Sequence, residues 1–185
     1  MNTEDAALAR RAVSGEAAAA EELARRHGPA AFRLSRALGL GEHDAEDVAQ
    51  EVLVRLLRML DRYDPEKASL GTLVHRITMN AASDHRRRLA GREVSSEDAD
   101  LRATPDARSF TEAAGLVPGE IRRAVLAAAS GLPERQRQVF VLHDLEELPV
   151  AEVAAALEIT ATNVRVHLCA ARRTLRGKLA HLLEG

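Results

Sequence analysis

The sequence predicts an all-α protein made of two small helical domains joined by a flexible linker. Three observations lead to this prediction. Good helix formers dominate the 185 residues, aromatic residues make up only 2% of them, and apolar residues recur every three or four positions in two separate regions. The expected boundaries are 5–92 for the first domain, 93–118 for the linker and 119–183 for the second domain.

Almost the whole stretch from residue 5 to residue 90 has a helical pattern, and within it helices are expected over residues 17–38, 44–60 and 72–89. Pro65 and Gly71 interrupt the helical pattern before the third of them. The second helix has the clearest periodicity, because its apolar residues recur at steps of four and neighbouring leucines widen the stripe. That stripe consists of Val48, Val52, Leu53, Leu56, Leu57 and Leu60.

The stretch from residue 90 to residue 119 has a different composition. It holds three glycines and two prolines, clusters of serine and aspartate, and few large apolar residues. This composition is typical of a flexible linker. An ordered surface loop is the alternative, although loops of this length are uncommon in compact domains.

Helical patterns return in the second domain. Gly131 ends a first helix, Pro133 stands near the first position of the next, and Thr160 is a candidate N-cap for the last. The expected helices are 121–130, one that opens at Pro133, 149–157 and 161–182.

The stretch "VAEVAAALEITATNVRVHLCAARRTL" has the pattern of a helix-turn-helix. Ala154 is small where the two helices would cross, and Val164 and Leu168 would face back toward the first helix. Glu158 stands where glycine would take a left-handed conformation easily. A non-glycine residue there costs about 1 kcal/mol, so a slightly altered turn is expected.

The last helix is basic, with no acidic residue from Ile159 to Leu183. Arg165, Arg172 and Arg176 lie within about 20° of one direction on a regular helix. Polar groups in its first turn suit base edges, and the arginines suit phosphates. The alternative is a solvated amphipathic helix whose arginines only keep it soluble. The candidate DNA contacts are Thr160, Thr162, Asn163, Arg165, Val166, Arg172, Arg173 and Arg176.

The first domain contains an acidic segment, "GEHDAEDVAQEVLVRLLRML", with five acids before its first basic residue. Helix capping accounts for several of these acids, because carboxylates are stabilised at a helix N-terminus. A polar band beside a broad apolar stripe instead indicates a protein-docking face. The candidate residues of that face are Asp44, Asp47, Gln50, Glu51 and Arg55.

The segment "GTLVHRITMNAASDHRRRLAGR" has the opposite polarity, with five arginines against the single acid Asp84. An arginine run that complements a helix dipole is the alternative explanation. Two basic helices in different domains nevertheless suggest two separate contacts with nucleic acid. The net charge of −2 argues only against a uniformly basic surface.

Several function classes are not expected. The seven histidines form no H-E-x-x-H motif, and neither G-x-S-x-G nor a phosphate-binding loop is present. His85 and Asp84 are adjacent on a helix and so do not face one another. The single cysteine, Cys169, excludes an internal disulfide and a cysteine-rich zinc site. We expect no enzymatic activity, metal, cofactor or small-molecule substrate.

The chain lacks a run of 18 apolar residues and a signal-peptide pattern at its start. Membrane insertion is therefore not expected, and a cytoplasmic location is.

Three segments together resemble the extracytoplasmic-function (ECF) group of the sigma-70 family of bacterial transcription initiation factors. "DAEDVAQEVLVRLLRMLDRYDPEK" is similar to the family's polymerase-docking segment. "LVHRITMNAASDHRRR" is similar to its helix for the −10 promoter element. "LPERQRQVFVLHDLEELPVAEVAAALEITATNVRVHLCAARRTLRGKL" is similar to its region 4, which reads the −35 element.

The resemblance implies a sigma factor that binds core RNA polymerase, at the β′ clamp helices and the β flap, and directs promoter recognition and melting. It also implies promoter DNA and an anti-sigma factor as partners. In ECF relatives the loop before the −10 helix captures a flipped base, and here that loop is about 61–69. The implied −10 contacts are Tyr63, Asp64, Lys67, His75, Arg76, Asn80, Asp84, Arg86, Arg87 and Arg88.

The sequence departs from the family pattern at two places. Leu70, Leu73 and His75 stand where relatives commonly carry aromatic residues, and stacking on an unpaired base is worth about 1–3 kcal/mol. Melting is therefore expected to rely more on a pocket than on a stacked ring. In the last helix "HLCAAR" replaces the more usual "HLHRAR", so Cys169 and Ala170 remove a ring and a charge.

The alternative function is a two-domain helix-turn-helix regulator that acts without being a polymerase subunit. Its second domain would look the same. Its first domain, however, would have no need of a basic −10-like helix beside an acidic docking helix.

Overall fold

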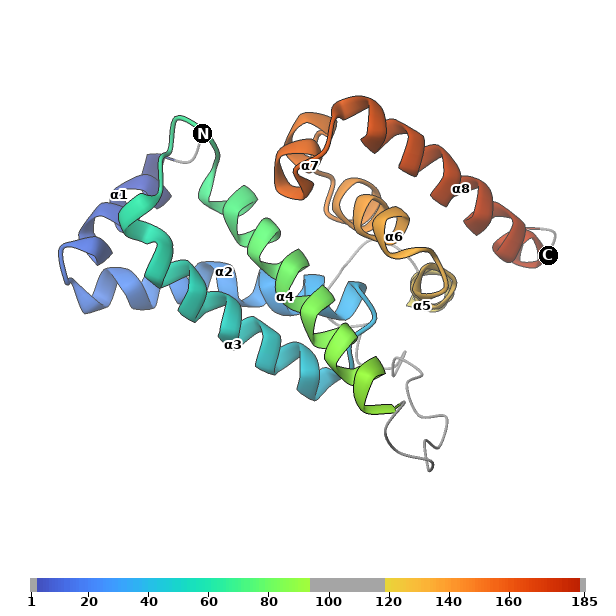
Figure 1. The fold of residues 1–185 in the computed structure, drawn as a ribbon, viewed down its shortest axis with the longest axis horizontal. Coiled ribbons are helices and arrows are strands. Elements are labelled where there is room, and N and C mark those ends of the chain that lie inside the picture. Colours follow the sequence, from blue (N-terminus) through green and yellow to red (C-terminus); the bar gives the residue numbers. More distant parts are fainter. Residues whose placement is uncertain (1–2, 94–118, 184–185) are drawn as a thin grey trace.

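The computed structural model describes residues 3–93 and 119–183, and every regular element in these two ranges is helical (Figure 1). The predicted linker lies outside the described residues, apart from Glu93 at the end of a helix. No helix in the described ranges combines the length and the apolar character that crossing a membrane would require.

The N-terminal domain contains four α-helices around one core. They are α1 (Thr3–Val13), α2 (Ala17–Ala37), α3 (Glu42–Met59) and α4 (Leu70–Glu93), with a short 3-10 turn η1 (Leu60–Arg62) after α3. The apolar stripe of α3 is buried at Val48, Val52 and Leu56 and packs between α2 and α4. Leu57 was expected to widen that stripe, but it is 39% exposed.

The C-terminal domain is built from four further α-helices. They are α5 (Gly119–Ser130), α6 (Glu134–Phe140), α7 (Val150–Leu157) and α8 (Ala161–Leu183), with a π-helical turn η2 (Val141–Leu145) that continues α6. α8 packs against α5, α6 and α7. The core of this domain includes Val139, Leu142, Val153, Val164, Leu168, Ala171 and Leu175.

The turn between α7 and α8 has the helix-turn-helix geometry. Glu158 takes the left-handed conformation itself, with φ 54° and ψ 43°. The turn therefore keeps its usual geometry, and the expected alteration does not occur. The N–H of Ile159 donates to the carbonyl of Ala154 at 3.1 Å. Thr160 caps α8, because its Oγ1 accepts the N–H of Asn163 at 3.2 Å.

The two domains touch along α4, which faces α6 and α7 (Figure 1). Near the start of α4, Thr72 Oγ1 donates to Glu152 Oε2 on α7 at 3.2 Å. Further along α4, Gln138 Nε2 on α6 donates to Ser83 Oγ at 2.9 Å. The named contacts across this interface are polar, as is common between domains that move relative to one another.

Candidate nucleic-acid interface

The first turns of α8 present an open polar face. Thr162, Asn163 and Arg165 are exposed, while Val164 between them is fully buried against the domain core. Val166 is 59% exposed although it is apolar. An exposed apolar side chain beside hydrogen-bonding groups can contact a thymine methyl group in a major groove.

A basic hollow of about 390 Å³ follows along the same helix. Arg165, Leu168, Cys169, Arg172, Arg173 and Arg176 line it. Cys169 is exposed and lies among these arginines. The fixed positive charge of this hollow suits a phosphate backbone.

Arg172 already has a partner within the protein. Its Nε lies 3.0 Å from Asp144 Oδ2 and its Nη2 lies 2.5 Å from Asp144 Oδ1. This bidentate bond raises the pKa of Arg172 and ties α8 to η2. The sequence grouped Arg172 with the DNA contacts, whereas its guanidinium serves an internal contact in this structure.

Some polar side chains of α3 are exposed, and others already bind a neighbouring residue. Asp47 and Gln50 are exposed, whereas Glu51 accepts from Arg55 Nη2 at 2.5 Å. The carboxylate of Asp44 lies 2.9 Å from Nε2 of His85 on α4. Asp44 therefore helps to hold α3 against α4.

Two apolar residues of the same α3 face were missed by sequence reasoning. Val54 is 48% exposed and Leu57 is 39% exposed. They follow Asp47 and Gln50 at steps of three or four residues and so lie on the same face of α3. This spacing could have indicated from the sequence that they belong to the polar face. It was overlooked because the many apolar residues of α3 were assigned to the buried stripe.

The loop before α4 forms a small hollow of about 280 Å³. Asp64 organises the loop, because its Oδ1 accepts the N–H of Glu66 at 3.0 Å and its Oδ2 lies 3.3 Å from Lys67 Nζ. Tyr63 is half-buried, and burial raises the pKa of its hydroxyl. The lining residues are Met59, Arg62, Tyr63, Asp64, Lys67, Ala68, Thr72, Leu73, Arg76 and Ala155. The sequence did not suggest Met59 or Thr72 for this site, and Arg62 lies in the expected loop 61–69 without having been named as a contact.

His75 turns one ring nitrogen into the protein rather than into the hollow. Its Nδ1 is buried and finds no hydrogen-bond partner among the described residues. Burial, helped by His27 and Arg33, lowers the pKa of His75 to about 4. The imidazole is neutral at pH 7 and so makes a poor partner for a phosphate.

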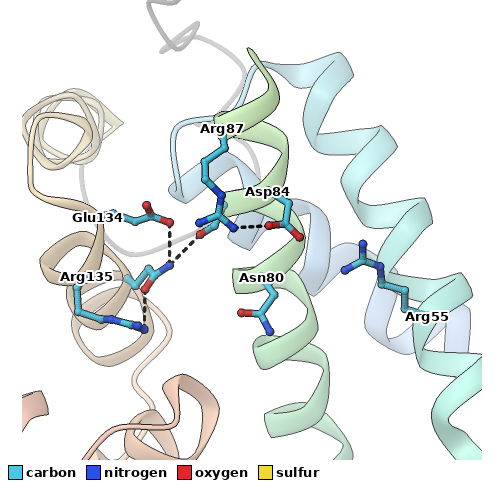
Figure 2. Close-up of a pocket in the computed structure, with 8 residues that line it drawn as sticks. Arg55, Asn80, Asp84, Arg87, Glu134 and Arg135 are labelled. Atoms are coloured by element: carbon cyan, nitrogen blue, oxygen red, sulfur yellow. Dashed lines mark hydrogen bonds and ion pairs between the residues drawn. The ribbon is translucent and has the colours of Figure 1, made fainter. Parts of the chain in front are cut away.

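The second half of α4 lines a different hollow, of about 550 Å³, that α6 closes from the other side (Figure 2). Asp84 pairs with Arg87 there. On α6, Gln138 accepts from Arg135 at 3.1 Å while it donates to Ser83. The lining residues are Arg55, Asn80, Ser83, Asp84, Arg87, Glu134, Arg135 and Gln138.

The expected −10 residues are thus divided between two places. Tyr63, Asp64, Lys67 and Arg76 come together at the loop hollow, whereas Asn80, Asp84 and Arg87 lie further along α4. Arg86 is half-buried, and Arg88 Nη2 lies 3.9 Å from Glu51 Oε2.

Comparison with known protein families gives two matches, in the order that the fold suggests. Residues 8–92 match the family described as "Sigma-70 region 2" and residues 122–175 match "Sigma-70, region 4". The ECF RNA polymerase sigma factor SigE of Mycolicibacterium smegmatis is 31% identical over 160 residues, which are 86% of this chain and 61% of that protein. SigM of Mycobacterium tuberculosis is 29% identical over 98% of this chain and 87% of its own length.

Two solved structures share the fold. CnrH, solved in complex with the cytosolic domain of CnrY, superposes with a TM-score of 0.71 at 26% identity, over 96% of this chain and 97% of CnrH. RpoE of Bartonella quintana, solved with the anti-sigma factor NepR, gives a TM-score of 0.64 at 17% identity, over 86% and 96% of the two chains. The matches favour a sigma factor over the separate helix-turn-helix regulator. The chain belongs to the sigma-70 family and is an ECF-type RNA polymerase sigma factor.

Proposed function

We propose that this sigma factor binds core RNA polymerase through α3 and directs promoter recognition and melting through α4 and α8. The observation that carries the proposal is the separation of three surfaces on one chain. An acidic and apolar face lies on α3, a pocketed loop precedes α4, and a basic open face lies on α8. Residues 5–92 would form the docking and −10 domain, 93–118 the linker and 119–183 the −35 domain.

The docking face would combine charge with exposed apolar area. Asp47 and Gln50 supply the polar part, and Val54 and Leu57 supply apolar area that is now open to water. Apolar residues of this kind contribute strongly when a partner desolvates them. Asp44, Glu51 and Arg55 would support the face from its edge. We assign this face to the β′ clamp helices and the second domain to the β flap.

The −35 element would be read by the start of α8 in the major groove. Thr160, Thr162, Asn163, Arg165 and Val166 would discriminate bases, since they lie at the open start of the helix. Arg173 and Arg176 would contact phosphates. Arg172 would act mainly by fixing α8 through Asp144.

The −10 element would be read as an unwound strand at the loop hollow. The hollow measures about 280 Å³ with Ala155 of α7 as part of its wall, and extruding a base costs a few kcal/mol that contacts at this site must offset. Tyr63, Asp64, Lys67 and Arg76 would supply those contacts. Asn80, Asp84, Arg86, Arg87 and Arg88 would guide the backbone along α4, and His75 would support the helix from inside.

The proposed function consists of binding and needs no covalent chemistry from this chain. The Bartonella RpoE was solved with the anti-sigma factor NepR and CnrH with the cytosolic domain of CnrY. We propose an anti-sigma factor as a partner of this chain. Because bacterial RNA polymerase and promoters are cytoplasmic, the proposed place of action is the cytoplasm.

In-vitro transcription tests the proposal directly. The full chain is added to core RNA polymerase with a library of randomised promoters, and the transcripts are sequenced. We expect transcripts from templates with a common −10 and −35 pattern. Transcription no higher than with core polymerase alone would refute the proposal. A chain that binds duplex DNA tightly by itself and ignores core polymerase in a pull-down would instead support the separate regulator.

A further inference from the structure

The hollow assigned to the unpaired −10 base is not formed by one domain alone. Nine of its ten lining residues belong to the segment from Met59 to Arg76, and the tenth, Ala155, belongs to α7 of the helix-turn-helix. Two contacts flank Ala155. Thr72 is bonded to Glu152 at 3.2 Å, and Arg76 Nη1 lies 3.6 Å from Glu158 Oε1.

These three residues of α7 and its C-terminal end are placed to act together. Glu152 and Ala155 lie three positions apart on α7, and Glu158 follows as its left-handed C-cap. Their partners Thr72 and Arg76 are one helical turn apart on α4 and both line the hollow. The two carboxylates therefore occupy polar groups that an incoming nucleotide would need.

Glu158 reaches Arg76 from a strained backbone position. Its φ of 54° lies in the left-handed region, where glycine would be more stable than glutamate. Backbone strain of this kind is often associated with a functional role. The carboxylate that glycine would lack is the group that pairs with Arg76.

The contact is built to be reversible. Glu158 is 75% exposed and Arg76 is 37% exposed, and exposed ion pairs are individually weak. The remaining contact named across the interface, Gln138 with Ser83, is also a polar one. Meanwhile the polar first turns of α8 keep an open face, at Asn163, Arg165 and Val166 among others.

We propose that α7 closes the −10 pocket of the free protein, with Glu152 and Glu158 as the two latches, and that the pocket opens only when the domains separate. The closed form is autoinhibited for capture of an unpaired base, while the −35 face stays open. Any binding that holds the two domains apart releases Thr72 and Arg76. The identity of the pocket's ligand rests on the proposed function, but the closure itself does not.

The closure can be measured without DNA by the accessibility of a thiol in the pocket. In the full chain, Ala68→Cys places a thiol at a lining position, and Cys169→Ser removes the natural one. The rate of labelling by fluorescein maleimide is divided by the rate for the same chain unfolded in urea. The exposed Cys169 of the unaltered chain provides the value for an open thiol, normalised in the same way.

The chain offers a matched control for the latch. Glu147 is also exposed and also left-handed, with φ 56°, and it is not among the residues that line the pocket. Glu158→Gly and Glu147→Gly are therefore the same chemical change in the same backbone conformation. Only the first removes a latch.

We expect the thiol introduced by Ala68→Cys to label more slowly than Cys169. Glu158→Gly should raise its labelling rate about two- to fivefold, as expected for loss of one exposed ion pair. The rise should be larger in Glu152→Ala/Glu158→Gly, and Glu147→Gly should cause no change.

Two results would overturn the closure. One is an equal rate in the Glu158→Gly and Glu147→Gly chains, and the other is a pocket thiol that reacts as fast as Cys169. If transcription fails but the latch variants behave as expected, the proposed function falls and the closure stands. If transcription succeeds but the latch variants do not behave as expected, only the closure is refuted.

Discussion

The bidentate pair between Arg172 and Asp144 allows a structural arginine to be distinguished from a DNA-binding one. Asp144 is 19% exposed and Arg172 is 53% exposed, so the pair is partly screened by water. Two parallel N–H···O bonds place it at the upper end of the range for such pairs, at about 1 kcal/mol. A double-mutant cycle with Asp144→Ala and Arg172→Ala should therefore give a coupling free energy near that value.

The measurement is urea unfolding of the four proteins, with thermal unfolding as a check. For a domain of this size a loss of about 1 kcal/mol lowers Tm by about 4–8 °C. The two single variants and the double variant should be destabilised by similar amounts, because each removes the same pair. Additive losses in the double variant would refute the structural role of Arg172.

The same variants give a second, independent readout in DNA binding. Each phosphate contact contributes about 0.9 to the slope of log affinity against log salt concentration. Arg176→Ala should reduce the slope for holoenzyme on a library-selected promoter by about one, whereas Arg172→Ala should leave it unchanged. A reduced slope for Arg172→Ala would show that this guanidinium binds DNA in the complex despite Asp144.

Three further predictions follow from the described surfaces. Val54→Asp should weaken binding to core polymerase by about tenfold or more in a competition assay, while the unfolding curve stays the same. Val13→Asp is the matched control, because Val13 is an apolar residue on α1 that is 52% exposed. Equal losses of affinity in the two variants would refute the assignment of polymerase docking to α3. Because burial lowers the pKa of His75 to about 4, the unfolded chain binds more protons below about pH 6.5, so stability should fall from pH 6.5 to pH 4 by at most about 3 kcal/mol. His75→Gln should flatten that part of the stability profile, and an unchanged profile would contradict the assignment. Glu158→Gly and Glu147→Gly should each raise stability by up to about 1 kcal/mol, because glycine relieves left-handed strain, and a loss of stability in both would contradict this strain.

Local sequence patterns predicted the helices well because helices are stabilised by contacts close along the chain. Steps of four predicted the buried face of α3, and Thr160 was correctly identified as the cap of α8. Leu57 was misread because periodicity shows which residues share a face, not whether a neighbour covers that face. The 3-10 turn and the π-helical turn leave no comparable signal in composition.

Contacts between distant residues were beyond the reach of the sequence. Thr72 and Glu152 are 80 positions apart, and Arg172 and Asp144 are 28 apart. Both pairs depend on how helices pack rather than on local spacing. The surplus of arginine on α8 was readable, but which guanidinium was already occupied was not.

The shared core of α7 and α8 has a mechanical consequence. Val153 and Leu157 of α7 are buried in the same core as Val164 and Leu168 of α8, so the two helices form one stiff lever. A displacement of α8 in the groove of DNA must carry α7 with it. Any binding that displaces α8 therefore also shifts Glu152 and Glu158 relative to Thr72 and Arg76 of α4.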